Sequence, residues 1–146
     1  MKNQISYLFN FLLIVLTISC SNNDDSTVEN EQNVSNCEIN IKENTALLIC
    51  IDGNDLALPN EIIEYEATFY SRNDNPSNAN FSWTIESGNM EILNVENSTE
   101  NSNDYIVSKS FATIRFKSDY VGNGLISVNA ENTTGIASYD YPVELK

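Results

Sequence analysis

The sequence predicts an all-β sandwich of seven or eight strands for residues 37 to 146. From Cys37 onward, apolar and polar side chains alternate with a period of two, as in strands that bury one face. The alternating runs are short, and clusters of Asn, Gly, Asp and Pro separate them. No stretch after residue 37 has a convincing helical period. The length also fits, because a sandwich of two packed sheets usually has about 100 residues.

The segment before this domain, residues 1 to 19, has the features of an export signal. Lys2 supplies a positive start, and a mainly apolar stretch runs from Leu8 to Ile18. Ser19 is the small residue at the end of the stretch. A helix that crosses a bilayer needs roughly 20 apolar residues, so this stretch is too short to span one. We therefore expect residues 1 to 19 to be a signal peptide.

A cysteine directly follows this signal. The stretch Thr17-Ile18-Ser19-Cys20 resembles the lipobox of bacterial lipoproteins. The resemblance implies that the Cys20 thiol takes a diacylglyceryl group and that Cys20 becomes the first residue after cleavage, which makes the membrane an expected partner. Thr17 departs from the motif, which usually has leucine or another aliphatic residue at that position. The alternative is a plain secreted protein whose signal ends near a cysteine.

Residues 20 to 36 are predicted to form a flexible acidic tether, because two valines are the only apolar residues between positions 21 and 36. Ser21 to Asp25 resembles the short tract that sends Bacteroidota lipoproteins to the outer face of the outer membrane. This resemblance implies an outer-membrane lipoprotein that faces the cell surface. A tether that is polar only to stay solvated is the alternative. Asp25-Ser26-Thr27 resembles the O-glycosylation signal of those organisms, which makes Ser26 a candidate site.

The two remaining cysteines, Cys37 and Cys50, are predicted to form a disulfide in an oxidising compartment. They are equidistant from Glu43-Asn44, so a hairpin that turned there would place them opposite each other on antiparallel strands. Two buried free thiols are the alternative. A zinc site would need two further ligands, and the chain has no histidine. We expect neither a metal nor a cofactor.

The charge of the chain excludes one class of partner. The formal net charge is −14, and removal of residues 1 to 19 would take away Lys2 but no acid. Nucleic acid would be repelled, since phosphate contacts need lysine and arginine. A cationic partner or a divalent cation is permitted, although a solvated acidic face also explains the composition.

The expected strands are recognised by their inward-facing residues. In "IIEYEATFY", Glu64, Glu66 and Thr68 fall on a polar face, on the other side of the strand from its apolar residues. Trp83 alternates with two apolar neighbours, so we interpret it as a core residue rather than a platform for carbohydrate. The residues expected to face the core are Ile63, Tyr65, Ala67 and Phe69; Phe81, Trp83 and Ile85; Ala112, Ile114 and Phe116; Ile126, Val128 and Ala130; and Tyr139, Tyr141, Val143 and Leu145.

Several of these residues carry a resemblance to a family. Gly53, Tyr65, "FSWTIESGN" with Trp83 and Gly88, and "YVGNGLISVNAENTTG" from Tyr120 to Gly135 resemble PKD-like, immunoglobulin-like domains of Bacteroidota surface proteins. The resemblance covers roughly Leu47 to Lys146 and implies an immunoglobulin-like sandwich. The expected disulfide departs from the family, because it joins an N-terminal extension to the first strand. The extension is therefore a candidate for an additional strand.

Catalysis is not expected. Without histidine there is no Ser-His-Asp or Cys-His arrangement, and no glycine-rich loop is suited to phosphate. A small sandwich also leaves little material for a deep cleft between paired carboxylates. The leading interpretation is a surface-anchored, non-catalytic module for binding or adhesion, with a protein or a glycan as ligand. The alternative is a structural or accessory subunit that docks on an outer-membrane assembly.

The expected topology suggests which end binds. In an immunoglobulin-like sandwich, the first strand starts at the end that carries "SRNDNPSNA" and "ENTTG". A tether entering there would leave the opposite end, with residues 52–60, 86–90 and 118–124, facing outward. That end mixes acids with an aromatic ring, which suits a cation-bearing partner or a hydrated sugar. Ordinary polar turns, with the tyrosine packed beneath its own loop, are the alternative. The candidate binding residues are Asp52, Asp55, Asp119 and Tyr120.

Overall fold

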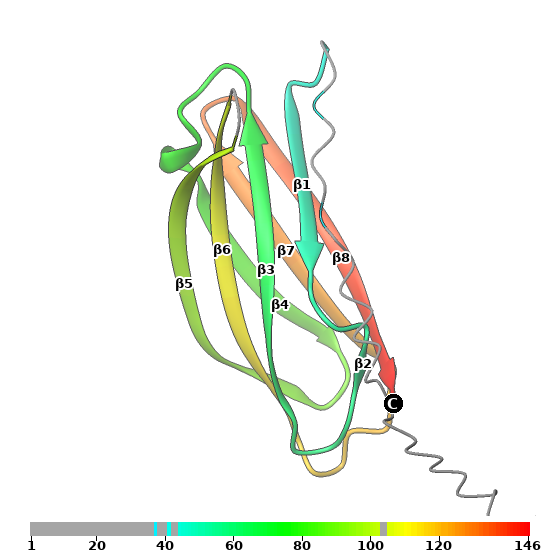
Figure 1. Ribbon diagram of the computed structural model, residues 1–146. Coiled ribbons are helices and arrows are strands. Elements are labelled where there is room, and N and C mark those ends of the chain that lie inside the picture. The colour runs from blue at the N-terminus through cyan, green and yellow to red at the C-terminus, as the bar shows by residue number, and fades with distance from the viewer. Residues whose placement is uncertain (1–36, 38–40, 42–43, 103–104) are drawn as a thin grey trace, which may run out of the picture. The chain divides into compact units, whose positions relative to one another are not determined.

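The structure is a computed structural model that describes residues 37, 41, 44–102 and 105–146 (Figure 1). The predicted signal peptide at residues 1–19 and the predicted tether at residues 20–36 lie outside the described residues. The lipidation site expected at Cys20 and the glycosylation site expected at Ser26 therefore stay predictions.

The described part of the chain folds into eight strands and one short 3₁₀ helix, η1. The strands form two four-stranded sheets, with the orders β1-β3-β6-β5 and β2-β8-β7-β4 (Figure 1). This arrangement confirms the predicted all-β sandwich and its strand number. The elements are β1 (Leu47–Asp52), β2 (Leu56–Ala57), β3 (Ile62–Ser71), η1 (Pro76–Asn78), β4 (Asn80–Ser87), β5 (Met90–Ser102), β6 (Tyr105–Phe116), β7 (Gly124–Asn132) and β8 (Gly135–Leu145).

The hydrophobic core lies between the two sheets and is built by the predicted alternation. Tyr65, Ala67 and Phe69 of β3 are fully buried, as are the alternating apolar residues of β6 and β7. Trp83 is buried too, and its Nε1 donates a hydrogen bond to Ser110 Oγ over 2.9 Å. A buried indole needs such a partner, so Trp83 is a core residue as predicted.

The last strand departs from its predicted burial. Tyr141 and Val143 lie in the core, but Tyr139 is 40% exposed and Leu145 is 47% exposed. At the sheet edge the neighbour of β8 is β2, which pairs only with Glu144 and Leu145. Over most of its length, including Tyr139, β8 is therefore an edge strand, whereas Leu145 pairs with β2 and is exposed at the last position of the strand.

The loops gather at the two ends of the sandwich as predicted. At one end, Asp74 from the β3–β4 loop accepts hydrogen bonds from the amide and the hydroxyl of Thr133 in the β7–β8 turn. At the other end, the Lys117 amide donates to the Asn89 carbonyl and the Ser87 hydroxyl donates to the Asn123 carbonyl. The second end thus combines the β4–β5 and β6–β7 connections.

The predicted disulfide between Cys37 and Cys50 is present, with Cα atoms 5.9 Å apart. The predicted hairpin around Glu43-Asn44 falls largely outside the described residues and stays a prediction; among those described, Cys37 lies in no strand and β1 pairs with β3. Ile49 and Ile51 point into the core, so the side chain of Cys50 between them points outward. Cys37 therefore joins β1 from the outer side of the sheet.

The described residues around β1 show where Cys37 is held. Strand β1 begins at the end of the sandwich that carries the β3–β4 loop, since the Arg72 amide donates to the Ala46 carbonyl. Cys37, however, is tied to the last part of β1: its amide donates to Asp52 Oδ1 over 2.7 Å. The chain before Cys37 lies outside the described residues, so the predicted entry of the tether stays a prediction.

Candidate functional site

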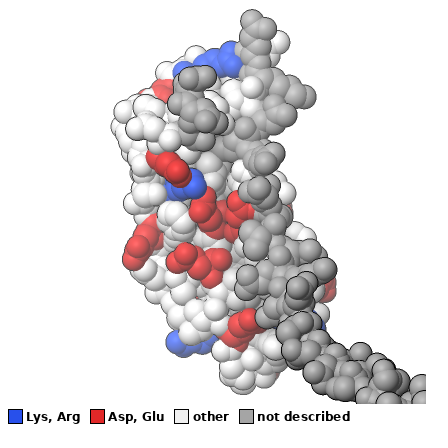
Figure 2. All heavy atoms as spheres, in the orientation of Figure 1, with Lys and Arg blue, Asp and Glu red and all other residues white. Residues whose placement is uncertain are grey.

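The outer face of the sheet β1-β3-β6-β5 is acidic. On β3, Tyr65 and Ala67 lie in the core, so the alternating Glu64 and Glu66 point outward. Figure 2 shows acidic side chains gathered over this face, with few basic ones among them. The acidic residues on these four strands are Asp52, Glu64, Glu66, Glu91, Glu96 and Glu100, and the basic residues are Lys109 and Arg115.

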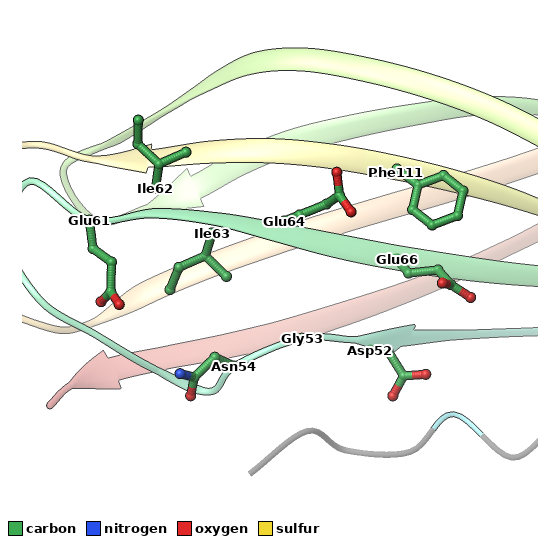
Figure 3. A pocket seen from close by; sticks show the side chains of 9 residues that line it. All are labelled: Asp52, Gly53, Asn54, Glu61, Ile62, Ile63, Glu64, Glu66 and Phe111. Atoms are coloured by element: carbon green, nitrogen blue, oxygen red, sulfur yellow. The ribbon is translucent and has the colours of Figure 1, made fainter. Parts of the chain in front are cut away.

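A hollow of about 400 Å³ opens on this face, between the start of β3 and the segment that leads from β1 to β2 (Figure 3). Three apolar side chains give it a partly hydrophobic lining, and four carboxylates surround them. The lining residues are Asp52, Gly53, Asn54, Glu61, Ile62, Ile63, Glu64, Glu66 and Phe111.

Two buried tyrosines hold one wall of the hollow in place. The Tyr65 hydroxyl donates to the Asn54 carbonyl over 2.9 Å, and the Tyr141 hydroxyl donates to the Gly53 carbonyl over 2.8 Å. Burial raises the pKa of Tyr65, so its hydroxyl stays a donor. A Cβ atom on Gly53 would lie 2.2 Å from Tyr65 Cδ1, which explains why glycine occupies this position.

The strand register aligns four residues into a row across the sheet, which we call the acidic row: Asp52, Glu66, Phe111 and Glu96. Asp52 of β1 lies opposite Glu66 of β3, and Glu66 lies opposite Phe111 of β6. On the other side, Phe111 lies opposite Glu96 of β5. A half-buried phenyl ring is thus flanked by carboxylates. This arrangement suits a cation with an apolar stem, because the ring face and the carboxylates attract the charge together.

Lys109 compensates only part of the negative charge. Its Nζ lies 2.7 Å from Glu66 Oε1 and 2.7 Å from Glu100 Oε2. Burial lowers the pKa of Lys109, but the hydrogen bonds and charges of these two carboxylates outweigh burial and raise it overall. One cation is therefore shared between two acids, and Glu64 and Glu96 have no salt bridge within the described part of the chain.

Asp52 has an unusual environment within the acidic row. Burial raises its pKa and the neighbouring charge of Glu66 adds to the effect, while the hydrogen bond from the Cys37 amide and the charge of Lys109 oppose it. A cation in the hollow would favour the ionised form of this carboxyl. The disulfide and the Asp52 hydrogen bond together fix the position of Cys37 beside the hollow.

No protein-family model matches this chain, and no curated protein matches it. Over the described ranges, no helix is long and apolar enough to cross a membrane. The same ranges contain no group of three or more Cys, Asp or Glu side chains placed to hold a metal ion. The site must therefore be interpreted from its own chemistry.

The candidate residues predicted from the sequence do not form one site. Asp52 lines the hollow. Asp55 does not line it, and its Oδ1 is buried without a hydrogen-bond donor among the described residues. Asp119 is exposed in the β6–β7 loop, at the end of the sandwich rather than on the acidic face.

The expectation of an aromatic binding residue at position 120 is wrong. Tyr120 is 2% exposed, and its ring packs edge-on against Phe116 with centroids 4.8 Å apart. Its hydroxyl donates to the Val143 carbonyl over 2.6 Å. The glycine at position 124 allows this approach, because a Cβ there would lie 2.8 Å from the Tyr120 hydroxyl oxygen. The ring is part of the core and cannot contact a ligand.

The sequence interpretation missed Glu64, Glu66 and Phe111 as site residues. Two features of the sequence could have pointed to these residues. The alternation places the two glutamates on the polar face of their strand. Phe111 is out of phase with the buried Ala112, Ile114 and Phe116, so it faces outward with them turned inward. The pairing of β3 with β6, which brings these residues together, depends on contacts between distant parts of the chain.

Proposed function

We propose that this domain is a non-catalytic binding module that takes lysine or arginine side chains of a partner protein on its acidic sheet face. The observation that carries the proposal is the acidic row beside the hollow, where Phe111 lies between Glu66 and Glu96. An ammonium or guanidinium group would gain charge-assisted hydrogen bonds from the carboxylates and a cation–π contact from the ring.

The apolar lining of the hollow favours a side chain of a partner as the ligand over a bare metal ion. Ile62, Ile63 and Phe111 border the hollow together with the carboxylates. The hydrocarbon stem of lysine or arginine packs on such a surface while its charged end reaches the acids. The net charge of −14 would also steer a basic partner toward the domain at low ionic strength.

A protein ligand fits the hollow better than a glycan. The side chains of Asp52, Glu61, Glu64 and Glu66 offer acceptors when ionised, and Asn54 is the one lining side chain with an amide donor. Sugar hydroxyls both donate and accept hydrogen bonds, so a lining made mostly of acceptors suits a cationic donor better than a sugar.

The proposal includes the setting in which the module works. The lipobox-like stretch that ends at Cys20 supports a lipid anchor, and the tract from Ser21 to Asp25 supports an outer-membrane location facing the cell surface. The Cys37–Cys50 disulfide fits an oxidising compartment. The two four-stranded sheets are compatible with the immunoglobulin-like, PKD-like identity suggested by Trp83 and the glycine-containing turns.

The test compares two double variants with equal charge changes. Asp52→Asn with Glu64→Gln removes two charges at the hollow and keeps an acceptor for the Cys37 amide. Glu86→Gln with Asp140→Asn removes two exposed charges on β4 and β8 of the other sheet. We expect the first variant to weaken binding of a lysine-containing peptide about three- to thirtyfold, measured by calorimetric titration of the full chain, and the second to leave it nearly unchanged. Equal weakening by both would show that only net charge matters and would refute the proposed site.

A further inference from the structure

Strand β5 is a long edge strand. It spans 13 residues and pairs antiparallel with β6 from Met90 opposite Phe116 to Ser102 opposite Tyr105. It ends the sheet order β1-β3-β6-β5, and Figure 1 shows it at the side of the sandwich away from β1. Among the strands that the structure describes, β5 therefore has one neighbour, and the backbone groups along its other edge have no strand partner.

Little in β5 protects this edge from a further strand. It contains no proline and no lysine, two residues that commonly block edges. One irregularity interrupts its register, between Ile92 and Asn94, near the start of the strand. Every residue from Leu93 to Glu100 is exposed. The part of β5 after the irregularity is thus a regular, accessible edge.

The charges on β5 disfavour pairing with a second copy of the chain. Glu96 and Glu100 lie on its outer face, where Glu100 contacts Lys109 of the neighbouring strand β6. Antiparallel pairing of two β5 edges would bring glutamates of both copies close together, and like charges on adjacent strands are destabilising. A strand with basic side chains would instead be attracted.

We propose that β5 accepts an added strand from an extended, basic segment of a partner protein. This inference rests on the proposed function, since it assumes the same basic partner, and adds that the partner binds as a fifth strand of the sheet. Main-chain hydrogen bonds would supply the affinity, and side chains on the two faces of the added strand would supply the specificity.

The side chains of β5 define the sequence pattern that such a segment needs. Glu96, Ser98 and Glu100 alternate along the outer face, so lysine or arginine would lie beside the two glutamates. Val95 points to the other face and is 41% exposed, so an apolar residue of the partner would cover it. The expected ligand alternates basic and apolar residues.

The inferred strand would extend the acidic row. Glu96 lies directly opposite Phe111, and a strand added to β5 would run roughly 5 Å beyond it. A basic side chain on that strand would therefore lie at the end of the row, beside Glu96. The hollow at the opposite end of the row would remain open to a second basic residue of the same partner.

The experiment uses the full chain and a decapeptide that alternates lysine and valine. Two probes control it: the same peptide with its central amides N-methylated, which keeps the charges but removes the strand donors, and a decapeptide that alternates glutamate and valine. Affinity is measured by titration, and the backbone amide signals of the protein are followed by NMR. We expect the lysine peptide to bind with shifts along Val95 to Glu100, and the N-methylated peptide to lose this binding.

Protein variants complete the test. We expect the double variant Glu96→Gln, Glu100→Gln to bind the lysine peptide about three- to thirtyfold more weakly. The control variant Glu86→Gln, Asp140→Asn, on the other sheet, should bind it with nearly unchanged affinity. Shifts confined to the hollow, or equal binding of the N-methylated peptide, would overturn the added strand and leave the proposed function standing. A lysine peptide that bound no better than the glutamate peptide would overturn both. Peptide-free dimers formed through β5 would also overturn the inference.

Discussion

Single residues fix the wall of the hollow. Gly53 passes so close to the Tyr65 ring that no side chain fits between them. The hydroxyls of Tyr65 and Tyr141 then hold the two carbonyls of Gly53 and Asn54. The two rings contact each other edge-on, with centroids 5.8 Å apart. The shape of the acidic site therefore depends on buried residues that do not themselves bind.

A methyl group at position 53 tests this dependence. We expect Gly53→Ala to lower the free energy of unfolding by about 1–3 kcal/mol, because the Tyr65 ring is fully buried and cannot move away freely. Denaturant unfolding of the full chain measures the change.

A double-mutant cycle separates the clash from other effects of the alanine. In a Tyr65→Leu background the ring is gone, so Gly53→Ala should cost clearly less than in the native chain. An equal cost in both backgrounds would mean that the close approach of the ring is not what requires glycine at this position.

At the scale of single elements, the sequence predicted most strands well. Alternation identified β3, β6 and β7 with their buried faces, since Tyr65, Ile114 and Val128 are all fully buried. It also placed Glu64 and Glu66 on the polar face. It overestimated burial on β8, where Tyr139 is exposed because the neighbouring strand β2 is short.

Contacts between distant elements could not be predicted in the same way. Symmetry around Glu43-Asn44 placed Cys37 opposite Cys50, but it did not show that β1 pairs with β3 or that Cys37 reaches Cys50 from the outer side of the sheet. The acidic row needs four strands in one register, which no local pattern contains. Tyr120 followed a polar turn sequence, yet space left by a glycine allows it to pack in the core. The fold class was therefore predictable, while the site was not.

At the scale of the whole molecule, the two sheets have different outer faces. The sheet β1-β3-β6-β5 carries the acidic row and the hollow. The strands of the other sheet also carry acids, Glu86, Glu131, Asp140 and Glu144, but what sets the first sheet apart is the half-buried Phe111 between carboxylates beside the hollow. A lysine or arginine side chain would contact the ring and the apolar lining of the hollow as well as the carboxylates, so the domain is expected to bind in a defined orientation.

The proposed anchor would hold this oriented domain at a membrane. We expect Cys20→Ser to abolish incorporation of a labelled fatty acid and to shift the protein out of the membrane fraction, because the thiol that would carry the lipid is missing. Ser19→Ala keeps a small residue before the cysteine and should retain the label. Label retained in the Cys20→Ser chain would contradict lipidation at this residue.

The central claim, that the acidic sheet face binds a basic partner, is tested most directly by carbodiimide cross-linking in native envelopes. This reagent joins a carboxylate to a lysine that contacts it, and mass spectrometry then identifies the linked residues. We expect cross-links from a partner lysine to Asp52, Glu64, Glu66 or Glu96. Cross-links found instead at Glu86, Asp140 or Glu144, on strands of the other sheet, would contradict the claim.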